Sequence, residues 1–154
     1  MLSELLPLMA NKNYLYLGDS LHTPYGGRSQ KSITELSEKG VSFLFEQGAK
    51  IVLIACNTAS ADALRSLQIK FPERKILGVL VPTVEEALSQ SRFGRIGLVA
   101  TRGTVETGNY EKEIQKRAQE FYQPSDTRAL SSPKLFSVPC PLLVPLIEVG
   151  WITK

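Results

Sequence analysis

The sequence predicts an α/β fold with mostly parallel sheets, and its hydropathy pattern carries that prediction. Short apolar runs, bounded by polar or turn residues, alternate with stretches of helical periodicity. Continuous apolar runs are typical of strands that are buried on both faces. Their alternation with helices indicates α/β layers around a parallel sheet. The expected strands cover residues 14–17, 51–55, 76–80 and 96–100.

Helical patterns fill the segments around these strands. One helix ends at Gly48, a natural C-terminal stop, and is defined by apolar residues at helical spacing: Ile33, Leu36, Val41, Leu44 and Phe45. A second follows Ala55 and closes before Pro72. Thr83 and Glu86 have the spacing of a capping box, which predicts a helix start there. A further helix is expected over 105–121 and a loop over 123–134, and the first ten residues are expected to form an amphipathic or buried helix.

Composition excludes several classes of function. The 154 residues are 43% hydrophobic and 21% charged, as in a globular protein of one or two compact units. The 18 basic and 15 acidic side chains are spread along the chain, so neither nucleic acid nor a membrane is an expected partner. No apolar run approaches the ~20 residues of a membrane span. No closely spaced ligand set predicts a metal site. Without a secretion signal we expect a cytoplasmic protein and no disulfide between Cys56 and Cys140.

The residues after each expected strand are the candidates for chemistry, because ligands of parallel sheets bind at the carboxyl ends of the strands. The loop after the first strand carries Tyr25 and Gly26, and its amides could hold a carboxylate, or it is a plain turn. The second strand is followed by Cys56, Asn57 and Thr58. A thiol at a helix start is placed to act as a thiolate, and the alternative is a buried cysteine that behaves as a small hydrophobe.

Further polar groups follow the last expected strand. Thr101 and Thr104 are first of all candidate helix caps. Three strand ends rich in hydroxyl or amide groups nevertheless fit an amino acid or dicarboxylate ligand. His22 has no evident partner for a triad and is interpreted as a loop residue. Cys140 lies between two prolines, with no helix start beside it, and is interpreted as structural.

Five blocks of the sequence, in order, resemble the glutamate racemases of the aspartate/glutamate racemase superfamily. They are YLGDSLHTPYGGRS, IACNTASA, VPTVEEA, IGLVATRGTVETGNY and CPLLVPLIEVG, and together they cover nearly the whole chain. The resemblance implies two α/β lobes with the amino acid between them. It also implies interconversion of L- and D-glutamate without a cofactor or metal, which supplies D-glutamate for peptidoglycan, and it allows a homodimer.

The resemblance also implies roles for individual residues. In this family one cysteine thiolate removes the α-proton, and a second cysteine returns a proton to the opposite face. Cys56 corresponds to the first of these cysteines. The matching positions for substrate contacts are Tyr25, Gly26, Asn57, Thr58, Thr101 and Thr104. His22 stands where many relatives carry Arg.

Two blocks of the family are not found in these 154 residues: an opening Asp-Ser-Gly loop and a Gly-Cys-Thr-His-Tyr-Pro block that carries the second cysteine. We therefore expect a chain shortened at both ends and inactive by itself. Residues 1–93 would form a first lobe without its first strand, and residues 94–154 part of a second. Two alternatives stay open: a racemase for aspartate or another amino acid, and a non-catalytic fragment that binds an amino acid. No activator is predicted from the sequence.

Overall fold

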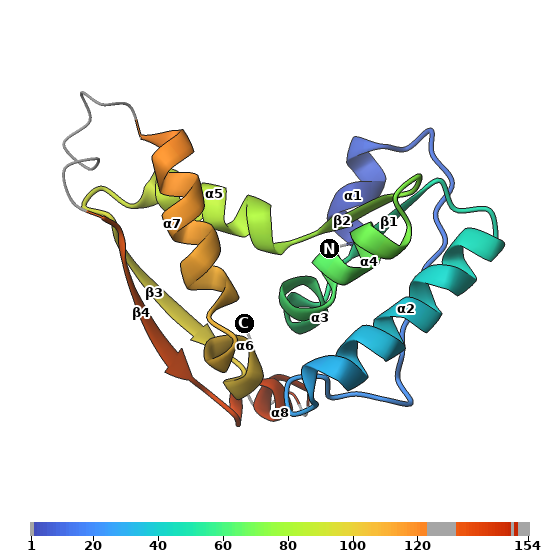
Figure 1. Cartoon of the computed structure of the whole chain (residues 1–154). Helices are drawn as coiled ribbons and strands as arrows, with labels where there is room; N and C mark the ends of the chain where they lie inside the picture. The colour runs from blue at the N-terminus through green and yellow to red at the C-terminus, as the bar shows by residue number, and fades with distance from the viewer. Residues whose placement is uncertain (1, 123–131, 149, 151–154) are drawn as a thin grey trace.

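The computed structural model describes residues 2–122, 132–148 and 150. Two small parallel sheets lie in separate arms of a V-shaped molecule (Figure 1). In the first, β1 (Ile51–Ile54) pairs with β2 (Lys75–Gly78), and Val52 lies opposite Ile76. In the second, β3 (Arg95–Ala100) pairs with β4 (Lys134–Pro139), and Val99 lies opposite Val138. The predicted α/β class with parallel sheets is confirmed.

The core of the first arm lies between its sheet and helix α2 (Gln30–Glu46). Ser29 begins the helix, since its hydroxyl accepts a hydrogen bond from the Ser32 amide at 3.3 Å. The helix ends just before Gly48, whose φ of +90° is accessible to glycine at little cost. This confirms the predicted helix and its stop. Its inward-facing residues Ile33 and Val41 pack with the buried strand residues Val52 and Ile76.

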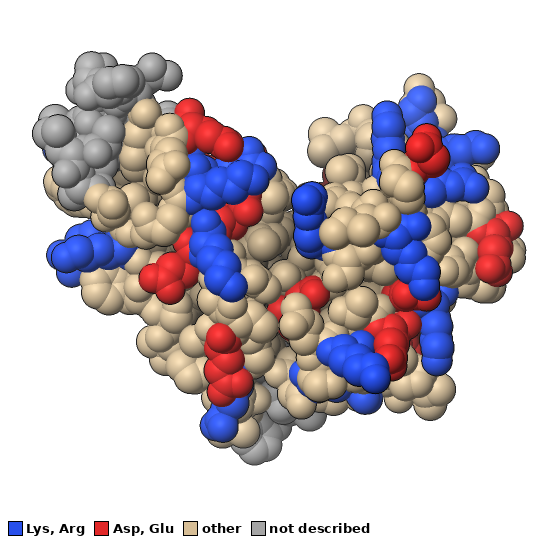
Figure 2. Space-filling view, viewed as in Figure 1, with Lys and Arg blue, Asp and Glu red and all other residues tan. Residues whose placement is uncertain are grey.

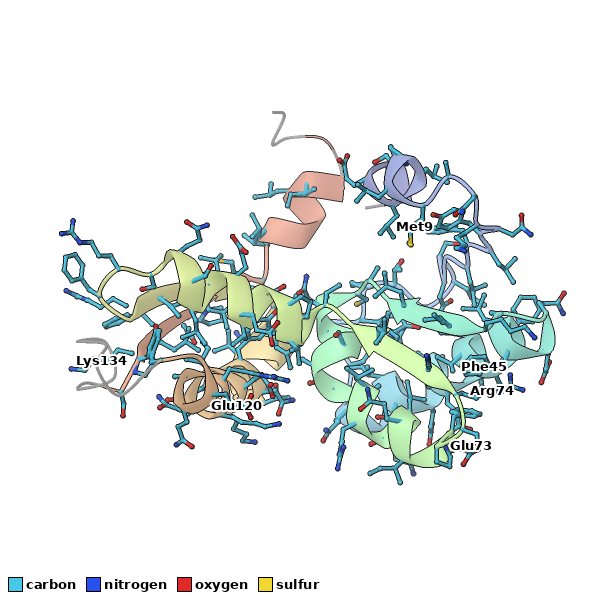
Figure 3. All side chains as sticks on the ribbon, turned by 90° about the horizontal axis from the view of Figure 1, so that it is seen from above. Met9, Phe45, Glu73, Arg74, Glu120 and Lys134 are labelled. Carbon is cyan, nitrogen blue, oxygen red and sulfur yellow. The ribbon has the colours of Figure 1, made fainter. Side chains whose placement is uncertain are left out.

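An aromatic and cationic contact fastens the far end of α2. The guanidinium of Arg74, in the turn before β2, lies 5.1 Å from the centre of the Phe45 ring. Figure 3 shows these two side chains next to each other at the outer end of the arm. The ring of Phe71 lies 5.7 Å from that of Phe45. These contacts orient α2 along the sheet, with its beginning toward the junction of the two arms.

Two of the predicted helices are each divided into a pair of shorter ones. The helix expected after Ala55 is α3 (Asn57–Asp62) followed by α4 (Leu64–Lys70), with a break at Ala63. The helix expected over 105–121 is α6 (Arg102–Glu106) followed by α7 (Asn109–Phe121). Gly108 separates the second pair, with a left-handed φ of +61°. Helix α5 (Leu80–Gln90) packs on α7 through a core that includes Leu88 and Ile114.

The N- and C-terminal helices are short. The first, α1 (Leu2–Leu8), fits the predicted N-terminal helix, although most of its described side chains are exposed. The last, α8 (Leu143–Glu148), follows β4. Within the described part of the chain no helix is long and apolar enough to cross a membrane. Figure 2 shows basic and acidic side chains interspersed over both arms on the face in view.

The strand predicted at residues 14–17 is wrong. This stretch is in no sheet, and Leu15, Tyr16 and Leu17 are exposed. An apolar run becomes a strand only where a neighbouring backbone supplies its hydrogen bonds, and none of the described strands pairs with it. No strand was predicted over β4, and the expected loop over 123–134 ends at the first residue of that strand. Residues 123–131 of that loop lie outside the described residues.

The capping box predicted at Thr83 is also wrong, because α5 begins three residues earlier, at Leu80. Its cap comes from another part of the chain. The hydroxyl of Ser60, on α3, accepts hydrogen bonds from the amides of Val79 at 2.8 Å and Leu80 at 3.3 Å. Ser60 is only 1% exposed. Gly78 permits this approach, since a Cβ there would collide with the Ser60 hydroxyl.

We predict that Ser60→Ala destabilises the fold by about 1–2 kcal/mol, the usual cost of losing a side-chain cap. The reason is that two amides at the start of α5 would lose their acceptor in a buried place. Urea unfolding followed by circular dichroism measures this cost.

Ser89→Ala is the matched control, because the exposed Ser89 hydroxyl donates to the Glu86 carbonyl within α5 itself. It should change the stability by less than about 0.5 kcal/mol. Equal effects of the two substitutions would contradict the capping role of Ser60.

Candidate active site

Cys56 lies where β1 ends and α3 begins, as predicted. It is the N-cap residue of α3, and its sulfur accepts a hydrogen bond from the Ala59 amide at 3.5 Å. The thiol position is exposed, so Cys56 is not a buried apolar filler. An exposed sulfur at a helix start, bonded by a helix amide, is accessible to a ligand or a reagent. The local chain geometry therefore favours the reactive interpretation of this cysteine.

The two residues after Cys56 connect α3 to the other arm. Thr58 is buried, and its hydroxyl lies 3.4 Å from that of buried Thr104, on α6. Asn57 is exposed, and its Oδ1 accepts a hydrogen bond from the Tyr110 hydroxyl at 2.7 Å. Side chains predicted as substrate contacts thus also hold the two arms together. Tyr110 is not among the predicted site residues, because no local sequence pattern relates it to a residue 53 positions away.

Thr101 and Thr104 form the turn that begins α6. The Thr101 hydroxyl accepts from the Thr104 amide at 3.4 Å, which confirms the predicted cap. The two hydroxyls are 3.0 Å apart. Together with Thr58 they make a continuous row of three hydroxyl groups, from the start of α3 to the end of β3. This row links the Cys56 loop to the Thr101 loop at the carboxyl ends of the two sheets.

Gly26 brings the third predicted loop against the same turn. A Cβ at this position would lie 2.5 Å from Thr101 Cγ2, a distance that real side chains do not tolerate. The Gly26 carbonyl also accepts a hydrogen bond from the Gly103 amide at 3.4 Å. The absence of a side chain at Gly26 is therefore a packing requirement. The loop is thus fastened to α6, and the choice between a carboxylate-binding loop and a plain turn stays a prediction.

Tyr25 is anchored by the carboxylate of Asp19, which is not among the predicted site residues. Its hydroxyl donates to Asp19 Oδ2 at 2.6 Å, and His22 Nδ1 lies 2.7 Å from Asp19 Oδ1. Burial, and then the bond to Asp19, raise the pKa of Tyr25, and the nearby Cys56 adds to the rise. The hydrogen bonds from Tyr25 and then His22 lower the pKa of Asp19. His22 is thus a loop residue, as predicted, but it has a partner.

Cys140 also lies near this edge. Its amide donates to the Ala100 carbonyl at 2.8 Å, which places it beside the Thr101 turn. The expectation that no helix begins nearby is wrong, since α8 starts at Leu143 and the Leu143 amide donates to the Cys140 carbonyl. The side chain is half-buried. Its structural role stays a prediction. No group of three or more metal-ligating side chains occurs among the described residues.

We predict that Cys56 reacts with iodoacetamide faster than Cys140 at neutral pH. Cys56 is exposed and its sulfur accepts a hydrogen bond from a helix amide, whereas Cys140 is half-buried. Peptide mass mapping of the folded protein after short labelling times gives both rates. Equal rates, or a faster Cys140, would contradict the assignment of Cys56.

We predict that Asp19→Asn lowers the stability at pH 7 and that its effect disappears in acid. The pKa of Asp19 is lower in the folded protein than its ordinary value of 3.8, so the ionised carboxylate stabilises the fold at pH values above 3.8. This contribution is lost as the pH falls through the lowered pKa. Urea unfolding at a series of pH values from 7 to about 2 measures the difference between the two proteins.

Asp62→Asn is a control of opposite sign, because burial raises the pKa of Asp62. Its charged form is disfavoured in the fold, so the substitution should become more favourable relative to wild type as the pH rises. A parallel pH dependence of the two variants would contradict the assigned environments.

The chain was compared with known proteins by sequence and by fold. No family model matches it. It is 38% identical to the glutamate racemase of Aquifex aeolicus over 142 residues, which are 92% of this chain and 50% of that protein. It is 36% identical to the glutamate racemase of Geobacter metallireducens over 152 residues, 97% of this chain and 51% of the relative. The chain thus spans about half the length of the curated relatives it matches.

Solved structures give the same result. The glutamate racemase of Aquifex pyrophilus superposes with a TM-score of 0.78 at 34% identity, over 99% of this chain and 55% of the other. The Francisella tularensis enzyme, solved in complex with D-glutamate, superposes with a TM-score of 0.81 at 27% identity, over 99% and 52%. By both sequence and fold, this chain is related to the glutamate racemases and corresponds to about half of one.

Proposed function

We propose that this chain is the part of a glutamate racemase that contributes one of two acid–base thiols, Cys56. The observation that carries the proposal is the placement of an exposed thiol at the start of α3, where its sulfur accepts from the Ala59 amide. The Thr58 hydroxyl on the same helix meets the hydroxyls of Thr104 and Thr101. The relatives at 36–38% identity are named glutamate racemases. Their activity is the most specific function that fits this site.

The chemistry requires a base on one face of the substrate α-carbon and an acid on the other. In the proposed reaction the Cys56 thiolate takes the α-proton, so that the Cα–H bond breaks and an S–H bond forms. A second thiol then donates its proton to the opposite face of the carbanion and becomes a thiolate. In the reverse direction the two groups exchange roles. Each positioned group contributes about 10²–10⁴-fold to the rate, so neither is dispensable. The proposed mechanism uses no cofactor and no metal.

The polar groups around Cys56 supply what an amino acid needs for binding. Exposed Asn57 and the Thr101 hydroxyl are donors for a carboxylate, and the Tyr25–Gly26 segment lies against the same turn. Such preset donors also stabilise the negative charge that develops at the α-carbon. Thr58 and Thr104 are buried and bonded to each other, so we propose that they hold the donors in place and contact the substrate only at its edge.

The second thiol of the proposed mechanism is not Cys140. Its backbone is tied to β3 and to the start of α8, and its side chain is half-buried. The sequence holds two cysteines in all. We propose that the second catalytic cysteine belongs to a segment of the whole enzyme outside these 154 residues. The whole enzyme would supply D-glutamate for peptidoglycan in the cytoplasm, with aspartate as the competing substrate to test and a homodimer as the assembly to test.

We predict that the isolated 154-residue chain does not measurably racemise L- or D-glutamate. One face of the α-carbon then lacks its acid, which costs on the order of 10²–10⁴-fold. Circular dichroism at the wavelength of glutamate absorption follows both enantiomers as substrates. The same chain joined to the flanking segments of a relative should racemise, and Cys56→Ser in that longer enzyme should abolish turnover.

Cys140→Ser in the longer enzyme is the matched control and should leave turnover within about twofold. Near-normal turnover by the isolated chain would show that Cys140, or a second copy, supplies the other thiol. Turnover of aspartate in place of glutamate by the longer enzyme would overturn the proposed substrate.

A further inference from the structure

The side chain of Asn57 is exposed on one side and held from the other. Asn57 is the first residue of α3 and lies next to Cys56. Its Oδ1 accepts the 2.7 Å hydrogen bond from Tyr110, the second residue of α7. Among the described residues its Nδ2 group has no hydrogen-bond partner. One end of the amide is therefore fixed, and its two N–H donors stay available.

The chemistry of Tyr110 determines which way the amide points. Tyr110 is 6% exposed, and burial raises the pKa of its hydroxyl, so the phenol stays protonated near neutral pH. A buried hydroxyl needs an acceptor for its proton. Asn57 Oδ1 is the acceptor that the structure provides. If the amide were turned over, its NH₂ group would face the phenol hydrogen and this proton would lose its acceptor.

The start of α7 is itself fixed against α3, which makes Tyr110 a rigid support. The neighbouring Asn109 side chain donates to the Ala61 carbonyl at 2.8 Å and to Asp62 Oδ1 at 3.4 Å. The ring of Tyr110 packs in the same core as Leu80 and Ile114. Tyr110 thus contacts the beginning of α3 and Asn109 its end.

We propose that Tyr110 is a positioning residue that orients the Asn57 amide, so that its NH₂ group donates to a carboxylate of an amino acid bound at Cys56. Tyr110 does not contact the ligand. Nothing in the local sequence around Cys56 fixes this amide, and the support comes from the other arm of the molecule. The inference about the ligand rests on the proposed function, whereas the orientation of the amide does not.

The orientation is tested first without any ligand. In the ¹⁵N-labelled chain, the Asn57 side-chain amide signals are assigned by their loss in Asn57→Ala. We expect Tyr110→Phe to move them toward the shifts of a free amide and to remove their cross-relaxation to the ring of residue 110. Tyr122→Phe is the matched control, since Tyr122 is a buried tyrosine of the same core whose hydroxyl lies 3.5 Å from the Leu88 carbonyl. Unchanged Asn57 signals in Tyr110→Phe would overturn the proposal.

Binding of D- and L-glutamate, measured by calorimetry on the same chain, tests the consequence. A net hydrogen bond is worth about 0.5–1.5 kcal/mol, so Tyr110→Phe should weaken binding roughly three- to tenfold, and Tyr122→Phe should not. In the Asn57→Ala background, Tyr110→Phe should have no further effect, because its action runs through that amide. An equal loss in that background would mean a general structural role and would overturn the proposal.

Asn57→Asp keeps the test decisive if Tyr110→Phe does not fold. It retains the acceptor for Tyr110 but replaces the NH₂ donors by a negative charge, so the fold should persist while glutamate binding is lost. Retained binding in Asn57→Asp would overturn the proposed donor role. If the wild-type chain binds neither enantiomer, the proposed function fails for this chain, and the amide signals still decide whether Tyr110 orients Asn57.

Discussion

Helix α3 is the constraint on which the rest of the structure depends. It is six residues long, too short to be stable through its own hydrogen bonds. It is held instead by contacts along its whole length. The Thr58 hydroxyl lies within hydrogen-bond distance of the Thr104 hydroxyl on α6, and Ser60 caps α5. At the other end of α3, the Ala61 carbonyl and the Asp62 carboxylate accept hydrogen bonds from the Asn109 side chain. The position of Cys56 at its start is therefore set by both arms of the molecule.

The close approach of these elements depends on small side chains. Gly78 leaves room for the Ser60 hydroxyl, and Gly26 leaves room for Thr101. Ala59 and Ala63 are almost fully buried in the core of the first arm. A side chain at Gly26 would push its loop away from Thr101, and one at Gly78 would push the end of β2 away from Ser60 on α3. The run of small residues after Cys56 is therefore a packing requirement.

The proposed site joins two kinds of polar group. The row of hydroxyls that runs from buried Thr58 and Thr104 to half-buried Thr101 fixes the loops. Asn57 and Cys56 are exposed, and the Asn57 Nδ2 group has no partner within the described part of the chain. Asp19 has a similar supporting role, because its carboxylate holds the Tyr25 side chain, which lies near Cys56. Rigid supports behind exposed reactive groups are what an active site needs to hold a substrate without reorganising.

The sequence by itself determined the α/β class, three of the four strands it proposed, and the placement of Cys56 and Thr101 at strand ends. These features are local: an apolar run, the residue that follows it and the helix that begins there all lie within a few positions. The predicted lobe boundary at residues 93 and 94 and the catalytic roles of the site residues stay predictions.

The tertiary structure decided what depends on distant partners. The run at 14–17 looked like a strand, but strand formation requires a neighbouring backbone that the sequence pattern cannot supply. The cap of α5 comes from Ser60, about twenty positions away, so the local Thr83–Glu86 spacing was misleading. The bond from Tyr110 to Asn57 spans 53 positions. Hydrogen bonds of this kind form only when the two arms are packed together, so hydropathy and residue spacing along the chain do not predict them.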